Sequence, residues 1–409
     1  MANTPNIRFQ GFTDDWEQRK LDDVAEFSKG SGYSKGDLVE FGTPIILYGR
    51  LYTNYETIIS DVDTFVESKD GSVYSKGGEV IVPASGETAE DIARAVSVDK
   101  SGILLGGDLN IVMPNEDINS AFLAISISNG NSQRELARKA QGKSVVHIHN
   151  EEIRNLVVPF PTKTEQNKIV EYFSNLDHLI TLHQRKCDEM KKMKKFMLQK
   201  MFPKNGAKNP EIRFDGFTDD WEQRKLGDYL QVSSEKNRDN RFTKDDVLSV
   251  SGEYGIVNQI EFQGRSFAGA SVSNYGVVET GDVVYTKSPL KSNPYGIIKT
   301  NKGIPGIVST LYAVYRPKEI TDSKFVQIYF ELDSRMNSYM HPLVNKGAKN
   351  DMKVSAENAL KGMVSFPQKD EQKRISSYFD TLDHLITLHQ RKAENLKNLK
   401  KYMLQNMFV

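Results

Sequence analysis

The stretch Leu176-Asp-His-Leu-Ile-Thr-Leu-His-Gln-Arg-Lys186 decides the fold, because it recurs letter for letter from Leu382 to Lys392. A second block, Gly11-Phe-Thr-Asp-Asp-Trp-Glu-Gln-Arg-Lys-Leu21, recurs from Gly216 to Leu226. The offsets are 206 and 205 residues, half of the 409-residue chain. This length suits two domains with connectors. The repeat therefore predicts two similar halves related by a pseudo-two-fold.

Each repeated helical block lies inside a longer segment, 164–202 or 370–408, that we expect to be one helix. A proline precedes both segments, and Thr164 and Asp370 are suitable N-caps. Seam residues alternate four and three apart: Ile169, Phe173, Leu176, Ile180, His183, Cys187, Met190, Lys194, Met197 and Met201, and again Ile375, Phe379, Leu382, Ile386, His389, Ala393, Leu396, Lys400, Met403 and Met407. This 3.5-residue period predicts a coiled coil in which the helices pair with each other, each spanning roughly 57 Å.

The polar residues of the seam fall at equivalent positions in the two helices. His183 corresponds to His389, and Lys194 corresponds to Lys400. Polar seam residues usually fix the register and orientation of a coiled coil. We expect that role here rather than ligand binding.

Two segments between the repeated blocks, about 22–158 and 227–365, do not align over most of their length. Both read as short strands with few helices. We expect strands at Pro44–Leu47, Glu79–Pro83, Leu109–Met113, Val247–Val250, Asp282–Thr286, Gly296–Lys299 and Thr310–Arg316, and helices at Asn119–Lys139 and Ser323–Met340. The turn Lys76-Gly-Gly-Glu-Val-Ile81 parallels Glu279-Thr-Gly-Asp-Val-Val284. The inserts are therefore predicted to share a fold and to differ in surface.

Polar and aromatic loop residues cluster at the predicted tips of both inserts. Arg, Lys, Asn and Ser are the side chains that read base edges or hold phosphates. The candidate DNA contacts are Lys29, Tyr33, Lys35, Tyr48, Arg50, Tyr52, Ser85 and Lys143 in the first half, and Lys236, Asn237, Arg238, Arg241, Tyr254, Lys287, Ser288, Lys291, Lys346 and Lys349 in the second. Any one of them, taken alone, is more often ordinary surface, because few side chains per module reach bases.

Composition limits the function classes. No apolar run reaches the roughly 20 residues that span a bilayer, and the sequence starts without a secretory signal pattern. A single cysteine, Cys187, fits a reducing cytoplasm. Lys and Arg number 54, as do Asp and Glu, and residues 1–162 carry 15 basic against 24 acidic side chains. Nucleic-acid binding would therefore need local patches, or positive charge from partners.

Sites for catalysis or metals are not recognised in the sequence. Gly142-Lys143-Ser144 resembles the end of a phosphate-binding loop, but Ala137 stands where the motif needs glycine. Asn293-Pro294-Tyr295 lacks one proline of a methyltransferase motif. His147 and His149 would share one face of a strand, yet no Cys or His cluster completes a zinc site. We expect neither a catalytic residue nor a bound cofactor or metal in this chain.

The chain closely resembles the DNA-specificity subunit of type I restriction–modification enzymes over nearly its whole length. The resemblance rests on the repeat, on Trp16-Glu-Gln-Arg-Lys-Leu21 and its copy from Trp221, and on two steps into the long helices. These steps are Val157-Val-Pro-Phe-Pro161 followed by Glu165-Gln166, and Val364-Ser-Phe-Pro367 followed by Glu371-Gln372. The recognition-domain landmarks are Gly77-Gly78-Glu79 through Ser85-Gly86 and Gly281-Asp282 through Ser288, where Pro289 replaces the glycine.

The resemblance implies an α+β chain with two target-recognition domains, 1–162 and 205–367. Two helices, 163–204 and 368–409, would form an antiparallel coiled coil that sets the distance between two halves of an asymmetric DNA site. The repeated frames would dock two modification subunits that carry S-adenosylmethionine and methylate adenine. Restriction subunits using ATP and Mg would join them. The implied partners are double-stranded DNA and these subunits, without a membrane.

Two other functional hypotheses compete with the specificity subunit. A single-chain methyltransferase-nuclease would need a cofactor loop and catalytic motifs, and the near-matches above fail on spacing. A non-catalytic bridging protein with a coiled-coil spacer accounts for the zero net charge. It does not account for two divergent polar inserts on one frame.

Overall fold

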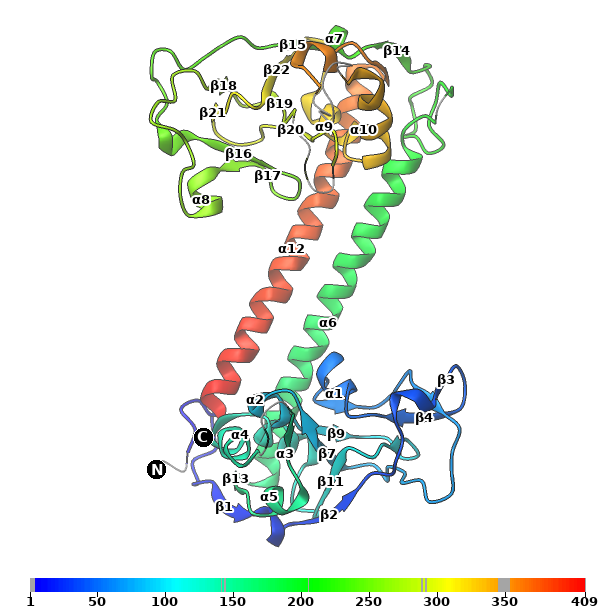
Figure 1. Ribbon diagram of the computed structural model, residues 1–409, viewed down its shortest axis with the longest axis vertical. Helices are drawn as coiled ribbons and strands as arrows, with labels where there is room; N and C mark the ends of the chain where they lie inside the picture. Colours follow the sequence, from blue (N-terminus) through cyan, green and yellow to red (C-terminus); the bar gives the residue numbers. More distant parts are fainter. Residues whose placement is uncertain are drawn as a thin grey trace. The chain divides into compact units, whose positions relative to one another are not determined.

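The computed structural model describes residues 4–140, 142, 145–204, 206–287, 290, 293–344 and 354–408. The chain forms two compact units (Figure 1). Unit 1 comprises residues 1–184 with 391–409, and unit 2 comprises residues 185–390. Each unit thus contains one insert and one end of each long helix, whereas the predicted boundaries place each helix in a segment of its own.

Unit 1 is built on short sheets. The strand β1 (Glu17–Lys20) pairs antiparallel with β13 (Val157–Phe160) and closes the frame at the base of the insert. A five-stranded sheet has the order β2 (Ala25–Lys29), β11 (Leu109–Pro114), β7 (Glu79–Pro83), β9 (Val96–Val98) and β5 (Ile58–Ile59). A four-stranded sheet has the order β10 (Leu104–Leu105), β4 (Thr43–Ile46), β6 (Phe65–Val66) and β3 (Leu38–Val39). The pair β8 (Ser85–Gly86) and β12 (Val146–His147) lies apart from both sheets.

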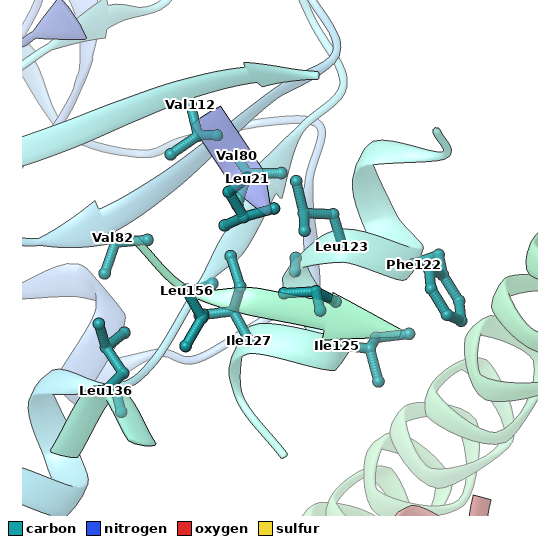
Figure 2. Packing of buried hydrophobic residues seen from close by; sticks show 14 of the residues in the cluster. Leu21, Val80, Val82, Val112, Phe122, Leu123, Ile125, Ile127, Leu136 and Leu156 are labelled. Carbon is teal, nitrogen blue, oxygen red and sulfur yellow. The ribbon is translucent and has the colours of Figure 1, made fainter. Parts of the chain in front are cut away.

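The helices of unit 1 are α1 (Arg50–Thr53), α2 (Ala89–Ile92), α3 (Ser120–Ile127), α4 (Gly130–Lys139) and α5 (Asn150–Arg154). Seven of the eight residues of α3 are buried, as expected for a helix with protein on every side. Figure 2 shows the resulting core, in which side chains of α3 (Phe122, Leu123, Ile125, Ile127) gather with Val80, Val82, Val112, Leu21 and Leu156. Leu21 belongs to the frame and the other residues belong to the insert, so frame and insert share one core.

Unit 2 repeats this plan with different lengths. Its frame strands are β14 (Glu222–Lys225) and β23 (Met363–Phe366), paired antiparallel like β1 and β13. Its main sheet has the order β15 (Leu230–Val232), β22 (Ala313–Pro317), β19 (Val283–Tyr285) and β20 (Ile298–Thr300). Unit 2 also contains two separate antiparallel strand pairs: β16 (Leu248–Ser251) with β17 (Gly255–Asn258), and β18 (Gly276–Val278) with β21 (Gly306–Val308). Its helices are α7 (Leu226–Tyr229), α8 (Gln259–Gln263), α9 (Ser323–Tyr329), α10 (Asp333–Met340) and α11 (Ala356–Ala359).

The two long helices are α6 (Lys163–Lys200) and α12 (Lys369–Met407), each beginning one residue before the prediction. The seam residues Ile169, Phe173, Leu176, Ile180 and Cys187 are all buried. In unit 1 the Lys400 ammonium lies 2.6 Å from Asp177, and in unit 2 the Lys194 ammonium lies 2.6 Å from Asp383. Late residues of one helix thus meet early residues of the other in each unit, so the helices pair antiparallel. The predicted coiled coil is confirmed.

Each unit is completed by an aromatic residue from the end of a long helix. In unit 1, Phe408 lies against Trp16, Phe122 and Phe173, with ring centroids 5.8–6.3 Å away. In unit 2, Phe202 occupies the same position against Trp221, Phe325 and Phe379. Because buried aromatic side chains dominate core energetics, each helix end is part of a domain core.

The repeated Glu-Gln step fastens each long helix to its unit. Glu165 is fully buried and accepts two hydrogen bonds from Arg8, at 2.6 and 2.8 Å. Gln166 accepts from the backbone of Asn119 and donates to the Pro161 carbonyl. The copy in unit 2 makes the same contacts: Arg213 binds Glu371, and Gln372 binds the backbone of Asp322 and Pro367. The near-identity of the frames therefore has an internal structural cause.

Two expected helices are each broken in two. The segment 119–139 forms α3 and α4, and 323–340 forms α9 and α10. At the first break the Ser128 hydroxyl bonds the Ala124 carbonyl and accepts from the Ala95 amide. Such side-chain bonds compete with the helical ladder and end α3. Within the described part of the chain, no helix is both long and apolar enough to cross a membrane.

Candidate nucleic-acid interface

Three of the predicted contacts gather in unit 1 around the strand pair β8–β12. The Tyr52 hydroxyl donates to the Ser85 carbonyl at 2.8 Å, and the Tyr48 ring lies 6.3 Å from the Tyr52 ring. A Cβ added to Gly86 would lie 2.9 Å from the Tyr52 oxygen, so this close approach needs glycine. The result is an aromatic and hydroxyl surface at the edge of β8.

Two histidines extend this surface, which we call the β8 patch (Tyr48, Tyr52, Ser85, His147 and His149). His147 Nδ1 lies 3.1 Å from the Ser85 hydroxyl. The rings of His147 and His149 are nearly parallel, with centroids 6.5 Å apart, and both side chains are exposed. Among the described residues, no group of three or more His, Cys, Asp or Glu side chains is placed to hold a metal. Imidazole nitrogens can instead donate to or accept from base edges or phosphates.

Tyr33 has a structural role. Its ring is buried, its hydroxyl lies 2.6 Å from the Ser72 hydroxyl, and it accepts from the Lys69 amide. The Lys69 ammonium sits 4.8 Å above the ring and binds Asp37. Hydrogen bonds from Lys69 and from Ser34 lower the pKa of Asp37 to about 2. The polar atom of Tyr33 is therefore used inside the loop, and its contact with DNA stays a prediction.

The remaining predicted residues of unit 1 differ in availability. Arg50 is mostly buried and binds both Asp63 and Glu56 at 2.9 Å, so its charge is already neutralised. Lys29 ends β2, and Lys35 lies in a short 3-10 turn; both are exposed. Lys143 lies outside the described residues.

Asn237 in unit 2 also has a structural role. It is fully buried, and its amide group binds both the amide and the carbonyl of Phe242. It therefore closes the 237–242 loop from inside and does not reach a ligand. In the sequence, an Asn followed by polar residues predicts a loop. The hydrogen bonds to Phe242, five residues away, decide that the Asn237 side chain points inward.

Lys236 and Lys287 are close enough in unit 2 to affect each other. Burial and then the Lys236 charge lower the pKa of Lys287, whose ammonium donates to the Thr310 carbonyl at 3.0 Å. Lys287 has φ of 56° and Asn240 has φ of 54°, and no other non-glycine residue in the described ranges has positive φ. Left-handed backbone at non-glycine residues is costly and clusters at functional sites. Both residues lie in the loops that the sequence singled out.

The other predicted residues of unit 2 that the structure describes lie in the 238–241 turn and at the β16–β17 turn. Arg241 binds Glu279 at 2.8 Å and stacks over Phe242, so its charge is neutralised. Arg238 is exposed in the neighbouring turn. Tyr254 is 61% exposed at the β16–β17 turn, with its ring 5.5 Å from that of Phe262. Ser288, Lys291, Lys346 and Lys349 lie outside the described residues.

The two units thus present different surfaces on similar scaffolds. Unit 1 offers tyrosine, serine and histidine at the β8 patch, and unit 2 offers lysine and arginine at Lys236, Arg238 and Lys287. From sequence, His147 and His149 suggested only a metal pair. Their alternation in a strand beside a predicted loop was the signal that they belong to the same surface as Ser85.

Known proteins resemble the chain over most of its length. The model of the type I restriction modification DNA specificity domain matches residues 13–192 and again residues 218–398. A putative type I restriction enzyme MjaX specificity subunit of Methanocaldococcus jannaschii is 24% identical, over 96% of this chain and 92% of its own. The MjaVIII specificity subunit of the same organism is 21% identical, over 76% and 75%.

The fold is also known from a solved structure. The crystal structure of the type I restriction–modification system S subunit from M. genitalium covers 99% of both chains with a TM-score of 0.59 and 14% identity. The family model matches most of the chain and matches it twice, once in each half. This chain therefore belongs to the family of type I restriction–modification DNA-specificity subunits.

Proposed function

We propose that this chain is the non-catalytic subunit that reads the target site of a type I restriction–modification complex. Each unit reads one half of a bipartite, asymmetric site. The observation that carries this proposal is the contrast between frame and loops. The Arg8–Glu165 and Arg213–Glu371 pairs and the aromatic contacts of Phe408 and Phe202 are the same in both units. The exposed loop side chains differ, with His147 and His149 in unit 1 and Arg238 and Tyr254 in unit 2.

The pairing of the long helices supports a role in setting the spacing of the half-sites. A helix of 38 residues is roughly 57 Å long, and α12 has 39. The buried seam and the Lys194–Asp383 and Lys400–Asp177 pairs fix the register in each unit. A fixed register gives a fixed gap between the half-sites.

Equivalent exposed apolar residues on the long helices support docking of two copies of one partner. Met193 and Phe196 on α6 are 49% and 47% exposed, and their counterparts Leu399 and Tyr402 on α12 are 41% and 55% exposed. Exposed apolar groups of this kind mark interaction sites. We call these the helix docking surfaces, and we assign them to two modification subunits that bind S-adenosylmethionine and methylate adenine. ATP and Mg belong to the restriction subunits.

Adenine-methylation sequencing of DNA from cells carrying this chain with its modification subunit tests the proposal. The expected result is one methylated motif made of two short half-sites around a fixed gap. A Y52A/H147A variant should change the preference in one half-site only, and K236A/K287A should change the other. A complete complex that leaves no such motif would instead favour the coiled-coil bridging protein.

A further inference from the structure

A basic groove in unit 1 separates the α3–α4 junction from the end of α12. It has a volume of about 600 Å³ and is lined by Asn129, Gln133, Arg134, Lys397, Lys400 and Lys401. A second cavity of about 150 Å³ shares Asn129, Gln133 and Lys400 and leads inward to Tyr55 and Ser128. We call the two together the α12 groove.

The groove is positive although unit 1 is acidic. Arg134, Lys397 and Lys401 are exposed, and the described residues include no carboxylate bonded to any of them. Lys400 binds Asp177. A cleft lined by one sign of charge concentrates ligands of the opposite sign. The α12 groove therefore selects an anion.

Unit 2 shows what fills the corresponding place there. Asn119 in unit 1 and Asp322 in unit 2 occupy equivalent positions, because the backbone N–H of each donates to the glutamine of the Glu-Gln step. Ser128 and Glu331 each lie nine residues further along the chain and are therefore counterparts. Glu331 accepts from Lys194 at 2.6 Å, so Lys194 is held between Glu331 and Asp383. Burial lowers the pKa of Lys194, and the two carboxylates raise it by more. Lys194 thus has two carboxylate partners.

Lys400, the counterpart of Lys194, has one carboxylate partner, Asp177, among the residues of unit 1 that the structure describes. Ser128 is too short to replace Glu331, and its hydroxyl is used by Ala124 and Ala95. The inner cavity lies where Glu331 would reach, and Lys400 lines it. Unit 1 therefore leaves open a carboxylate position that unit 2 fills from its own chain.

We propose that the α12 groove binds an acidic segment of a modification subunit, with one carboxylate reaching Lys400 as Glu331 reaches Lys194. The inference rests on the proposed function. The groove residues Lys397, Lys400 and Lys401 share two turns of α12 with Leu399 and Tyr402 of the helix docking surface, on opposite sides of a helix that is about 10 Å across. A partner that surrounds this part of α12 meets both. The inner cavity has room for a side chain and not for a DNA strand.

The two docking surfaces are then unequal. The partner on unit 1 gains contacts to the exposed cations of the α12 groove and to the inner position beside Lys400. In unit 2 Glu331 fills the inner position, and the groove of about 790 Å³ beside the end of α6 is lined by Lys200 and Lys204, which both bind Glu211 already. One modification subunit therefore binds more tightly than the other, and its extra affinity decreases with salt because exposed ion pairs are screened.

Stepwise binding of the modification subunit to the full-length chain, followed by native mass spectrometry and analytical ultracentrifugation, tests the inference. The variant K397Q/K401Q removes two groove charges. The matched control K191Q/K195Q removes the equivalent exposed lysines of α6, which do not line the groove beside the end of that helix. We expect the first variant to weaken the tighter step roughly tenfold, which two exposed charge pairs supply, and the control to leave both steps unchanged.

A second variant fills the groove from within. S128E supplies unit 1 with the glutamate of unit 2, and it should weaken the same step while Trp16 fluorescence reports an intact core. The inference is overturned if K397Q/K401Q leaves the tighter step unchanged, or if both lysine variants weaken that step equally. A loss of DNA affinity alone also overturns it and would assign the groove to DNA phosphates. If the unaltered chain binds no modification subunit, the proposed function itself fails.

Discussion

Phe408 lies against Trp16 with ring centroids 6.3 Å apart, so a residue near the end of the second half completes the core that the first half begins. Phe202 and Trp221 have the same relationship in unit 2, at 6.0 Å. Since the chain has two tryptophans, one in each core, each unit carries its own fluorescent probe.

The variant F408A should destabilise unit 1 by about 3 kcal/mol, because truncating a buried Phe leaves a cavity. Urea unfolding in a W221F background, where Trp16 is the only fluorescent tryptophan, measures this change. F202A in a W16F background is the matched test for unit 2. A Trp16 transition that does not move in F408A would show that the helix end contributes nothing to this core.

Removing Arg8 should cost about 3 kcal/mol, because it leaves the fully buried Glu165 carboxylate unpaired. The change is R8M, measured by thermal unfolding. The double variant R8M/E165L removes both charges and should recover most of the lost stability. If R8M and the double variant melt at the same reduced temperature, the loss comes from packing and not from the unpaired charge.

K287Q should make the plot of log DNA affinity against log salt concentration shallower by about one unit of slope, as expected for the loss of one phosphate contact. The measurement is DNA affinity of the assembled complex against salt concentration at neutral pH. R50Q is the matched control, because Arg50 is already paired with Glu56 and Asp63. Since burial lowers the pKa of Lys287, raising the pH should reduce the slope of the unaltered complex as Lys287 loses its proton, and should change the slope of K287Q less. Equal slopes for K287Q and R50Q would remove Lys287 from the interface.

Exchanging residues 22–156 with 227–362 should give a complex that reads the two half-sites in the opposite order. The junctions are equivalent, because Leu21 bonds Leu156 and Leu226 bonds Gly362 through the backbone. Methylation sequencing reads the outcome. A swapped chain that folds but keeps the original order would contradict modular reading.

The swap should also lose stability where the second insert contacts Asp380. Lys302 and Lys324 of the second insert bind Asp380 on α12, and the counterpart of Asp380 on α6 is Ser174. Adding S174D to the swapped chain should therefore raise its melting temperature, while S174N should not. Equal effects of the two substitutions would show that the charge is not involved.

Local patterns in the sequence were sufficient for much of the fold. The strand Glu79–Pro83 was predicted with its observed bounds, since a run of apolar residues after a Gly-Gly turn has few alternatives. The heptad pattern likewise predicted α6 and α12 to within two residues at their ends. The break at Ser128 was missed because its partner Ala95 lies 33 residues away in another element.

The candidate site was less predictable for the same reason. Tyr33 and Asn237 carry the residue types that contact DNA, yet Ser72 and Val272, more than 30 residues away, turn them inward. The charges of Arg50 and Arg241 are neutralised by Asp63 and Glu279, and the positions of these residues in the sequence do not show that they are close in space. Residue type locates a polar loop, but burial and pairing decide which of its side chains are free.

The contact of Phe408 with unit 1 also determines the order in which the molecule can mature. During synthesis, residues 185–390 of unit 2 emerge before residues 391–408, which unit 1 needs. The unit that is made first is therefore completed last, and until then its core is missing Phe408. Domains generally fold as they are made. Here the first insert must wait, with part of its aromatic core uncovered, until the second has been synthesised.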